Sequence, residues 1–402
     1  MSSMDEKLSK LVERVLYHHR TQGKAVEGVH IRGITDALRA DGVEVDIISL
    51  PGADPYASPK TMSPTRQATP LMKLVARFPE PLFELTELAY NAVAAWRVWR
   101  HLSSKGRVDF IYERYSLFMF AVVWLAKLKK IPMILEVNDS AMVERVRPLY
   151  FLRMAKAIEG WTFRNAAGLV FVSSVFRDRI QAAHGTIAPA IITPNAANID
   201  KFTSTPEQRA AARAKWKLDG KVVCGYLGAF LPWHAIDKFV FEIADQLKAR
   251  PDLVLLLVGD GSTFPEVSEF VRKRGLQDQV ILAGRVAHDD VPGLLAAMDM
   301  AILPSAGDYT SPMKLFEFMA CGIAPVAPNF LPIREVLKEG VTGWTFTPGR
   351  LDEAVSMVLS KSVDTQALHQ VGVAARAYIA AERQWRHNVV QLVEFVMKLS
   401  GR

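Results

Sequence analysis

The chain has 402 residues, half of them hydrophobic, and a formal net charge of +7 at pH 7. One hydrophobic core rarely exceeds about 250–300 residues, so this length predicts two domains. The excess positive charge lies in residues 1–198, which carry 26 Lys and Arg against 19 Asp and Glu, whereas residues 199–402 carry 23 of each. A basic half predicts an anionic partner, either a phosphorylated substrate or a membrane surface. We expect no nucleic acid partner, because no basic tract is interleaved with aromatic residues.

Cysteine usage and hydropathy exclude further classes of protein. Cys224 and Cys321 have the spacing of neither a disulfide scaffold nor a metal site, so a reducing, cytoplasmic compartment is expected. The N-terminus is charged, and the longest apolar run, Leu117 to Ala126, is far shorter than the roughly 20 residues that cross a bilayer. We therefore expect neither a secretory signal nor a membrane-spanning helix.

The beginning of the chain predicts a βαβ unit. A buried strand at 14–17 leads through a polar turn to a helix at 25–40, and 43–49 alternates as a second strand. The turn of such a unit faces the carboxyl edge of the sheet, where ligands bind. Its basic side chains are candidates for a ligand cleft, unless they form an ordinary solvated loop: His18, His19, Arg20 and Lys24.

A long helix is expected from Pro79 to Leu102, after a loop at 51–70 that is rich in Pro, Ser and Thr. The helix combines aromatic residues such as Trp96 and Trp99 with basic residues such as Arg100. Two interpretations stay open. The helix packs against its own sheet, or it lies in a membrane interface with its basic residues near anionic headgroups.

The rest of the first half continues the alternation, with strands expected at 108–112, 133–137, 168–172 and 191–192 and helices between them, one of them at 117–128. Glu136, Asn138 and Asp139 stand at the carboxyl end of the second of these strands, which is again the ligand edge. The turn-forming segment TPNAANIDKF, at 193–202, is the best candidate for a linker.

The second half repeats this architecture. Strands are expected at 222–226, 254–258, 280–282, 300–303 and 324–327, so the sequence predicts a second doubly wound sheet. Gly225 and Gly228 lack the third glycine and the acidic residue of a dinucleotide fingerprint, which argues against a nicotinamide enzyme. Asp289 and Asp290 are interpreted as a helix cap rather than a metal-binding pair.

The segment at 308–328 concentrates the polar chemistry of this half. Ser311 and Pro312 are expected to form a helix start, with Ser311 as the cap, so that the helix begins near Met313. Lys314 and Glu317 then share one helical face. A helix N-terminus with an added lysine suits a phosphate, and a glutamate one turn deeper suits the vicinal hydroxyls of a ribose. The alternative is an ordinary amphipathic helix with an exposed ion pair.

Several segments match a known family in their order along the chain and in the spacing between them. These segments are VEGVHIRGITDAL, YERYSLFMF, LEVNDS, PNAANIDKF, GAFLPWHAID, LLLVGDGS, GRVAHDDVP, SPMKLFEFMACGIAPVA and VTGWTF. Together they resemble glycosyltransferase family 4. The resemblance implies an α/β protein of two facing Rossmann-like domains, the GT-B fold, each with a mostly parallel doubly wound sheet. It implies an acceptor-binding domain at 1–198, a nucleotide-sugar-binding domain at 199–382, and a last helix at 383–402 that packs back on the first domain.

By this resemblance the second domain holds the donor. Glu317 is expected to bind the ribose hydroxyls, and the backbone at Arg285 and Val286 is expected to bind the base. The diphosphate is expected at amides of the helix start, and two glycines in earlier turns complete the donor set. The residues expected at the helix start are Ser311, Pro312, Met313 and Leu315, and the two glycines are Gly228 and Gly259.

Three positions depart from the family pattern. Tyr309, which stays a donor-site candidate, stands where members commonly have a second glutamate. Ala229 and His234 replace an arginine and a lysine that hold the diphosphate in many members. The leaving nucleoside diphosphate gains negative charge, so some cation must stabilise it. Lys314 is the expected substitute, with His234 as a second donor.

The acceptor set lies in the first domain. Many relatives carry His-Asp where this chain has Asn138 and Asp139, and Asn cannot act as a base. Retention in this family is usually explained by a leaving phosphate that takes the acceptor proton, so no protein base is required. Asp139 is therefore expected to orient the acceptor, and it joins Lys314 and His234 as the catalytic candidates. The acceptor-binding candidates are His30, Glu136, Asn138, Lys24 and Arg114.

The resemblance implies a retaining, metal-independent glycosyltransferase without a cofactor, which moves a sugar from a nucleotide diphosphate sugar to a hydroxyl of a saccharide or lipid-linked acceptor. UDP-sugars are favoured as donors over GDP-sugars, and the expected process is cell-surface polysaccharide or glycoconjugate synthesis. The basic first half favours a cytoplasmic chain in peripheral contact with the inner face of the plasma membrane. Two alternatives stay open: a non-catalytic nucleotide-sugar-binding partner, and a nucleotide-sugar 2-epimerase of similar shape.

Overall fold

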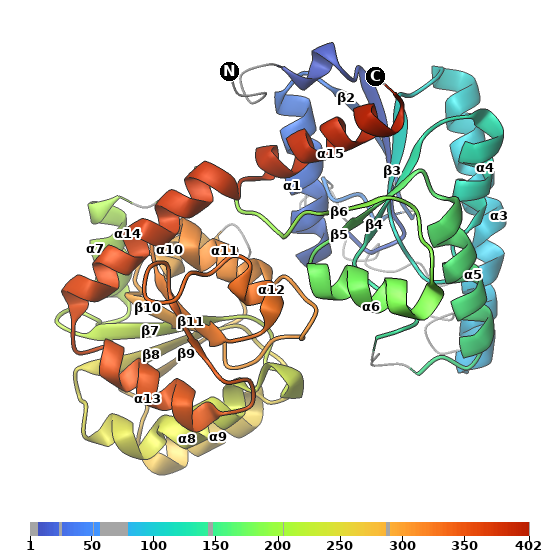
Figure 1. Ribbon diagram of the computed structural model, residues 1–402. Coiled ribbons are helices and arrows are strands. Elements are labelled where there is room, and N and C mark those ends of the chain that lie inside the picture. Colours follow the sequence, from blue (N-terminus) through green and yellow to red (C-terminus); the bar gives the residue numbers. More distant parts are fainter. Residues whose placement is uncertain are drawn as a thin grey trace. The chain divides into compact units, whose positions relative to one another are not determined.

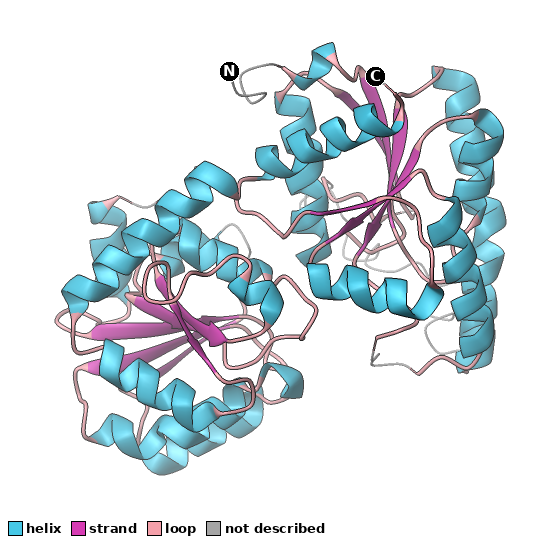
Figure 2. Cartoon of the chain, viewed as in Figure 1, coloured by secondary structure: helices cyan, strands magenta, loops and turns pink. Residues whose placement is uncertain are grey.

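The computed structural model describes residues 7–23, 26–50, 52–56, 79–143, 148–203, 205–286 and 290–401. Contacts within the chain divide it into two compact units, Met1–Pro194 with Trp385–Arg402 and Asn195–Gln384. Each unit is a sheet between two layers of helices (Figures 1 and 2). The prediction of two doubly wound sheets is confirmed.

The first unit contains a six-stranded parallel sheet in the order β2-β1-β3-β4-β5-β6. The strand order reverses between β1 and β3, which makes this pair the topological switch point. The middle strands are buried along most of their length, as expected for a sheet covered on both faces. The strands are β1 Arg14–His18, β2 Glu44–Ile48, β3 Phe110–Arg114, β4 Met133–Val137, β5 Gly168–Phe171 and β6 Ala190–Ile192.

Helices cover both faces of this sheet (Figure 1). One face carries α1 (Val26–Ala40) and α15 (Trp385–Leu399), and the other carries α3 (Glu80–Lys105), α4 (Ala121–Lys129) and α5 (Leu152–Asn165). A short 3-10 turn, Leu8–Lys10, precedes β1, and α6 (Ser174–His184) joins β5 to β6. The predicted cap of α6 is confirmed, because the Ser173 side chain accepts a hydrogen bond from the N–H of Phe176 at 3.2 Å.

α4 starts four residues later than the predicted helix at 117–128. Phe118 has a φ of 61°, outside the helical region, so the chain turns sharply before the helix begins. The side-chain oxygen of Asn91, on α3, accepts hydrogen bonds from the N–H groups of Phe120 and Ala121, both at 2.9 Å. A side chain from another helix therefore fixes the start of α4, which local sequence could not reveal.

The second unit has the strand order β12-β11-β10-β7-β8-β9, again parallel throughout, with its switch point between β7 and β10. One core lies between the sheet and the helices α8, α9 and α13, and a second core lies between the sheet and α10, α11 and α14. The strands are β7 Val222–Leu227, β8 Leu253–Val258, β9 Val280–Gly284, β10 Met300–Ile302, β11 Ala324–Pro328 and β12 Trp344–Phe346. The helices are α7 Pro206–Lys215, the 3-10 turn Pro232–His234, α8 Ile236–Lys248, α9 Phe264–Arg274, α10 Val291–Leu295, α11 Met313–Ala320, α12 Leu331–Arg334, α13 Leu351–Lys361 and α14 Thr365–Glu382.

Two expectations for this unit differ from the structure. α7 has no buried residue, so it lacks the apolar periodicity that identifies a helix, and the sequence analysis missed it. The signal that could have found it is the capping box of Thr205 and Gln208 with Pro206 at the helix start. Asp290 occupies the position before α10, but its side chain makes no capping hydrogen bond, and Asp289 lies outside the described residues. Asp290 thus has the predicted position at the start of α10 but not the hydrogen bond of a cap.

α15 belongs to the first unit although it is last in the chain. The Trp385 ring meets the His30 ring edge-on, with 4.8 Å between centroids, and it lies so close to Gly33 that a Cβ there would overlap the indole. Phe395 lies equally close to Gly168 on β5. The two glycines thus permit close approach of α15. Among the helices of the described residues, none is long and apolar enough to cross a bilayer.

Candidate functional site

The donor candidates gather at the switch point of the second sheet. The chain leaves β7 through a turn at Gly228, and it leaves the neighbouring β10 through the loop that enters α11. Ligands of doubly wound sheets bind outside the carboxyl ends of such a strand pair. The topology therefore brings Gly228 and the start of α11, which are far apart in sequence, to one place.

Lys314 is the cation at this place. Its Nζ lies so close to Gly228 that a Cβ on the glycine would overlap it, and it is 4.9 Å from the centroid of the Tyr226 ring. An ammonium over an aromatic face is attracted by the ring electrons, so Tyr226 helps to hold it. Burial lowers the pKa of Lys314 to about 8, against a raising effect of Glu317. The side chain therefore remains mostly protonated at pH 7.

Glu317 lies one turn further along α11 and is buried. Burial raises the pKa of its carboxyl to about 7, against the lowering effect of Lys314 and Lys201. An exposed ion pair, the alternative for this helix, is excluded because Glu317 is only 6% exposed. A buried carboxylate with a raised pKa needs hydrogen-bond donors, and the hydroxyls of a ligand would provide them.

α11 begins at Met313, as predicted, but the expected cap is absent. Ser311 does not cap it, because its Oγ accepts a hydrogen bond from the N–H of Asn195 at 3.0 Å, and Asn195 Nδ2 donates to the Ser311 carbonyl at 2.5 Å. Pro312 takes the N-cap position, and its side chain makes no capping hydrogen bond. An uncapped helix N-terminus offers amides to an anion. Asn195 lies in the segment interpreted as a linker, so sequence reasoning missed it.

Leu315 is the donor candidate whose groups already have partners in the protein. Its N–H donates to the carbonyl of Pro312 at 3.0 Å, and its side chain is fully buried in the core under α11. Its amide and its side chain are thus engaged within the fold, and its predicted role at the diphosphate stays a prediction. Met313 and Lys314 remain as the sources of amides in the first turn.

His234 stands beside Lys314 in the turn after β7. Its Nδ1 is 2.7 Å from the carbonyl oxygen of Ala229, which also accepts a hydrogen bond from the Tyr226 hydroxyl at 2.8 Å. Burial and the charge of Lys314 lower the pKa of His234, so the ring is neutral at pH 7. The contact with Ala229 assigns the proton to Nδ1. Nε2 then accepts rather than donates, and the role of His234 as a second donor stays a prediction.

The other donor candidates lie at the same edge of the sheet. Gly259 follows β8, and a Cβ there would overlap the Gly228 carbonyl, so the two turns pack backbone against backbone. Arg285 and Val286 follow β9, and the half-buried Tyr309 precedes α11. Within the described ranges, no group of three or more His, Cys, Asp and Glu side chains is arranged to hold a metal ion.

The acceptor candidates converge in the first unit on the carboxylate of Glu136, at the end of β4. Oε1 accepts hydrogen bonds from Arg114 Nη1 at 2.5 Å and from Asn138 Nδ2, and His30 Nδ1 lies 3.3 Å away. Tyr17 donates its hydroxyl to Oε2 at 3.3 Å. Four of the five predicted residues thus form one cluster, and Lys24 lies outside the described residues.

This cluster is built to position groups rather than to take a proton. Burial lowers the pKa of His30 to about 4, against the raising effect of Glu136, so the imidazole is neutral. The carboxylate of Glu136 is occupied by its donors. It therefore orients Arg114 and Asn138 and is a poor general base.

Asp139 directly follows this cluster and is half-buried. Its Oδ1 accepts a hydrogen bond from the N–H of Ser140 at 2.8 Å. The buried carboxylate of Glu159 accepts from Ser140 Oγ at 2.8 Å and from the Ala141 N–H at 2.9 Å, which fixes the loop that carries Asp139. Glu159 gave no signal in the sequence because it lies in the middle of α5.

The basic turn after β1 contributes to the fold rather than to a cleft. His18 Nδ1 is 2.5 Å from Glu113 Oε2, and both side chains are buried. Arg20 pairs with Glu87 of α3. Burial lowers the pKa of His19 to about 4, so its ring is neutral and buried.

Family models match most of the chain. One described as "Glycosyl transferase 4-like domain" matches residues 27–196, and one described as "Glycosyl transferases group 1" matches residues 221–361. The chain belongs to glycosyltransferase family 4. The resemblance inferred from the sequence motifs is thereby confirmed.

Named relatives of this family 4 chain are glycosyltransferases. Alpha-D-kanosaminyltransferase of Streptomyces kanamyceticus is 21% identical over 240 residues, which cover 58% of this chain and 62% of the relative. The GDP-mannose-dependent alpha-(1-6)-phosphatidylinositol monomannoside mannosyltransferase of Mycobacterium tuberculosis is 24% identical over 234 residues, 57% of this chain and 61% of the relative. The chain thus spans about three fifths of the length of these relatives.

Solved structures confirm the GT-B fold of this family 4 chain. HepE of Anabaena, in complex with UDP, superposes on this chain with a TM-score of 0.68 at 17% sequence identity. The superposition covers 97% of this chain and 100% of the HepE chain. Sucrose-phosphate synthase of Thermosynechococcus elongatus gives a TM-score of 0.69 at 18% identity, with the same coverage.

Proposed function

We propose that this chain is a retaining, metal-independent glycosyltransferase, which moves a sugar from a nucleotide diphosphate sugar to a hydroxyl of a saccharide or lipid-linked acceptor. One observation carries the proposal. The Lys314 ammonium lies against Gly228 at the switch point of the second sheet, beside the uncapped start of α11. A full positive charge next to a helix N-terminus suits a diphosphate.

In this proposal each group of the second unit has one task. Glu317 accepts hydrogen bonds from the ribose hydroxyls, and the amides of Met313 and Lys314 face the diphosphate. As the bond between the sugar and the diphosphate breaks, negative charge grows on the leaving group, and the Lys314 ammonium stabilises it. The leaving phosphate takes the proton of the attacking hydroxyl, so the new glycosidic bond forms without a protein base.

The first unit orients the acceptor in this proposal. Arg114 and Asn138 are fixed by Glu136, and the loop of Asp139 is fixed by Glu159. Such fixed donors and acceptors can hold a sugar hydroxyl in one orientation, which lowers the entropic part of the barrier. Asp139→Asn should then raise the KM for the acceptor. Full activity of that variant would remove Asp139 from this role.

The relatives support a choice of donor and process. HepE has been crystallised with UDP-glucose, and the mycobacterial relative is GDP-mannose-dependent, so UDP-sugars and GDP-sugars are the candidate donors, UDP-sugars first. The name of the mycobacterial relative gives a phosphatidylinositol mannoside as its acceptor, which supports a lipid-linked acceptor for this chain. We therefore propose cell-surface polysaccharide or glycoconjugate synthesis at the inner face of the plasma membrane.

A donor screen tests the proposal. The purified chain is melted with UDP, GDP, ADP and dTDP, because a ligand that binds only the folded state raises the melting temperature. The matching nucleotide sugar is then incubated with saccharide and lipid-linked acceptors, with and without EDTA. We expect EDTA-resistant release of the nucleoside diphosphate and a product whose anomeric configuration, measured by NMR, equals that of the donor.

Other outcomes identify the alternatives. Nucleotide binding without transfer to any acceptor would identify a non-catalytic binding partner. Conversion of the free sugar nucleotide into its epimer without an acceptor would identify a 2-epimerase. Loss of transfer in EDTA, with recovery on adding a divalent cation, would overturn metal independence.

A further inference from the structure

α3 buries the polar side chains of Glu84 and Asn91 beside Ala94 and Val98, and it exposes large apolar side chains to solvent. Exposed positions follow one another at helical spacing along its length. They carry the large apolar side chains Leu82, Leu85, Val93, Trp96 and Trp99. The two tryptophans are 53% and 48% exposed. An ordinary surface helix shows the reverse arrangement, so this stripe needs an explanation.

Polar side chains on the inward side of α3 hold the neighbouring segments in place. The buried carboxylate of Glu84 accepts hydrogen bonds from the N–H groups of Tyr150 and Phe151 at 2.6 and 2.8 Å, where α5 begins. Asn91 caps α4, and Glu87 pairs with Arg20. These contacts fix the rotation of α3 about its axis, so the apolar stripe cannot turn inward without breaking them.

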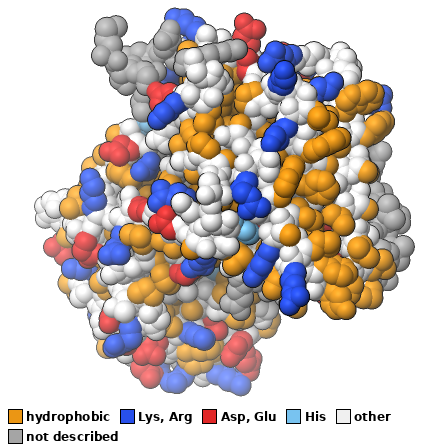
Figure 3. All heavy atoms as spheres, turned by 45° about the vertical axis from the view of Figure 1, so that its right-hand side comes forward, with side chains coloured by type: hydrophobic (Ala, Val, Ile, Leu, Met, Phe, Trp, Pro, Cys, Tyr) orange, Lys and Arg blue, Asp and Glu red, His pale blue; other side chains and the backbone are white. Residues whose placement is uncertain are grey.

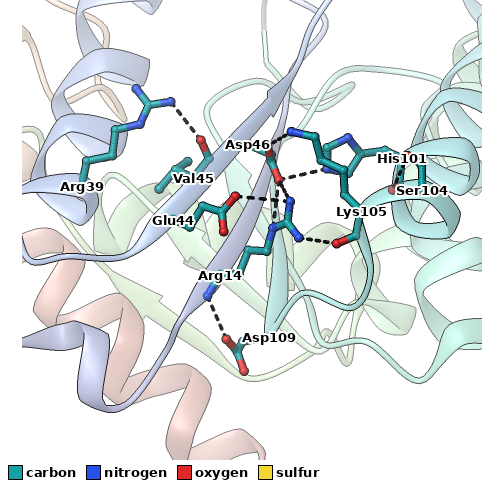
Figure 4. A network of polar contacts seen from close by, with 9 residues as sticks. All are labelled: Arg14, Arg39, Glu44, Val45, Asp46, His101, Ser104, Lys105 and Asp109. Atoms are coloured by element: carbon teal, nitrogen blue, oxygen red, sulfur yellow. Dashed lines mark hydrogen bonds and ion pairs between the residues drawn. The ribbon is translucent and has the colours of Figure 1, made fainter.

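The C-terminal part of α3 is held in the same way (Figure 4). Asp46 of β2 accepts hydrogen bonds from Lys105 at 2.9 Å and from Arg14 at 2.6 Å, and it lies 3.1 Å from the ring nitrogen of His101. Burial works against the charge of Asp46, but the bonds from Lys105 and Arg14 lower its pKa to about 2. The helix is therefore anchored along its whole length with the stripe outward.

Neighbouring elements extend the stripe into a face. α4 packs beside α3 and exposes Trp124 and Leu128, one turn apart, at 53% and 60%. Tyr150, held against α3 by Glu84, is 66% exposed. Figure 3 shows hydrophobic side chains gathered on this side of the first unit. We call it the α3–α4 face.

The charges around the α3–α4 face are basic. α4 contains no acidic residue, and Lys127 and Lys129 stand exposed beside Leu128. The exposed Arg100 follows the stripe on α3, with its guanidinium 5.4 Å from the centroid of the Trp96 ring. Tryptophan with flanking lysine and arginine is the composition of helices that lie in the headgroup region of an anionic bilayer. Charge and composition therefore favour a membrane over a protein partner.

We propose that the α3–α4 face docks the chain in the interface of an anionic membrane, with Trp96, Trp99 and Trp124 inserted among the headgroups. This deepens the proposed function, because it names the surface by which the chain would reach a lipid-linked acceptor. The first half of α3 contacts Arg20, which follows β1 at the carboxyl edge of the sheet where the Glu136 cluster lies. Docking would thus bring the acceptor side of the sheet close to the membrane.

Vesicle flotation with matched variants tests the proposal. The double variants Trp96→Glu/Trp99→Glu and Trp124→Glu/Leu128→Glu change only exposed positions of the α3–α4 face. Val363→Glu/Val373→Glu is the control, because both valines are exposed, at 70% and 53%, in the second unit. We expect wild type and control to float with vesicles of phosphatidylglycerol and phosphatidylcholine, and both face variants to bind at least about tenfold more weakly. High salt and pure phosphatidylcholine should also weaken binding of the wild type.

Several results would overturn the proposal. Equal vesicle binding by the wild type and both face variants would do so, as would equal losses in the control. If the wild type is a dimer in sedimentation and the face variants are monomers with unchanged vesicle binding, the face joins two copies of the chain instead. Thermal stability of each variant, measured alongside, shows that a loss of binding is not a loss of folding. Flotation needs no sugar transfer, so failure of the proposed reaction would leave this result unchanged.

Discussion

At the scale of single residues, the proposed donor site depends on Lys314. The family's usual arginine and lysine are replaced by Ala229 and His234, and His234 is neutral with its proton directed to the Ala229 carbonyl. The charge that grows on the leaving diphosphate then meets one ammonium group. We predict that Lys314→Ala lowers kcat/KM about 10²–10³-fold, as expected for loss of a group that stabilises developing charge.

The matched control for Lys314 is His234→Ala, because His234 lies near Lys314 in the turn after β7. It should lower kcat/KM far less, because the neutral ring has no charge to lose. Steady-state kinetics with the identified donor measure both variants. Equal and mild losses in the two would contradict the assignment of the cation.

The buried pair on α11 predicts a pH dependence of donor binding. Lys314, with a pKa of about 8, loses its charge as the pH rises through that value, so attraction for the diphosphate falls above pH 8. Glu317, with a pKa of about 7, becomes protonated below that value and can no longer accept from both ribose hydroxyls. Affinity should therefore peak between about pH 7 and 8 and fall by up to about tenfold per pH unit on either side.

Calorimetric titration of a nucleotide sugar across this range measures the profile, since the charge of the diphosphate diester stays constant there. Lys314→Met should remove the loss of affinity at alkaline pH, and Glu317→Gln should remove the loss of affinity at acidic pH. Both variants should have a lower peak affinity than the wild type. A profile that keeps both falls in both variants would show that other groups titrate.

At the scale of elements, α3 supports its neighbours through side chains that point inward. Asn91 accepts two hydrogen bonds at the start of α4 and donates one to the Phe118 carbonyl at 2.7 Å. We predict that Asn91→Ala destabilises the first unit by about 1–3 kcal/mol, because a cap is lost and buried backbone groups are left unpaired.

Urea unfolding measures the stability of Asn91→Ala and of a control variant, Ala92→Gln. Ala92 is the next residue of α3, and its side chain is exposed, whereas that of Asn91 is buried. The control should change stability by less than about 0.5 kcal/mol. If both variants unfolded at the same urea concentration as the wild type, the cap would contribute nothing to stability.

At the scale of the whole molecule, the chain ends inside the unit in which it begins. Trp385 is buried against His30 and Gly33 in the first unit, and Trp344 is buried to the same degree in the second. We predict that Trp385→Ala destabilises the first unit by about 3–5 kcal/mol, while the melting temperature shift caused by a bound nucleotide in the second unit persists.

Trp344→Ala is the matched variant, and it should lower the stability of the nucleotide-binding unit instead. Differential scanning calorimetry with and without nucleotide assigns each transition to its unit. Loss of nucleotide binding in Trp385→Ala would show that the two units do not fold separately.

The sequence by itself determined the two doubly wound sheets, the family, and the pair Lys314 and Glu317. Strand alternation and helix starts depend on residues near one another in the chain, so local patterns reveal them. Glu136, Asn138 and Asp139 were also predicted to lie at the ligand edge of the first sheet, because they stand at the carboxyl end of a parallel strand.

Only the tertiary structure decided how these groups are held. Asn195 takes the Ser311 hydroxyl away from the helix it was expected to cap, and Tyr226 lies under the Lys314 ammonium. The apolar stripe of α3 faces outward because Glu84, Glu87 and Asn91 find their partners inside. Each of these contacts joins segments that are distant in sequence, and neither composition nor spacing records which distant groups will meet.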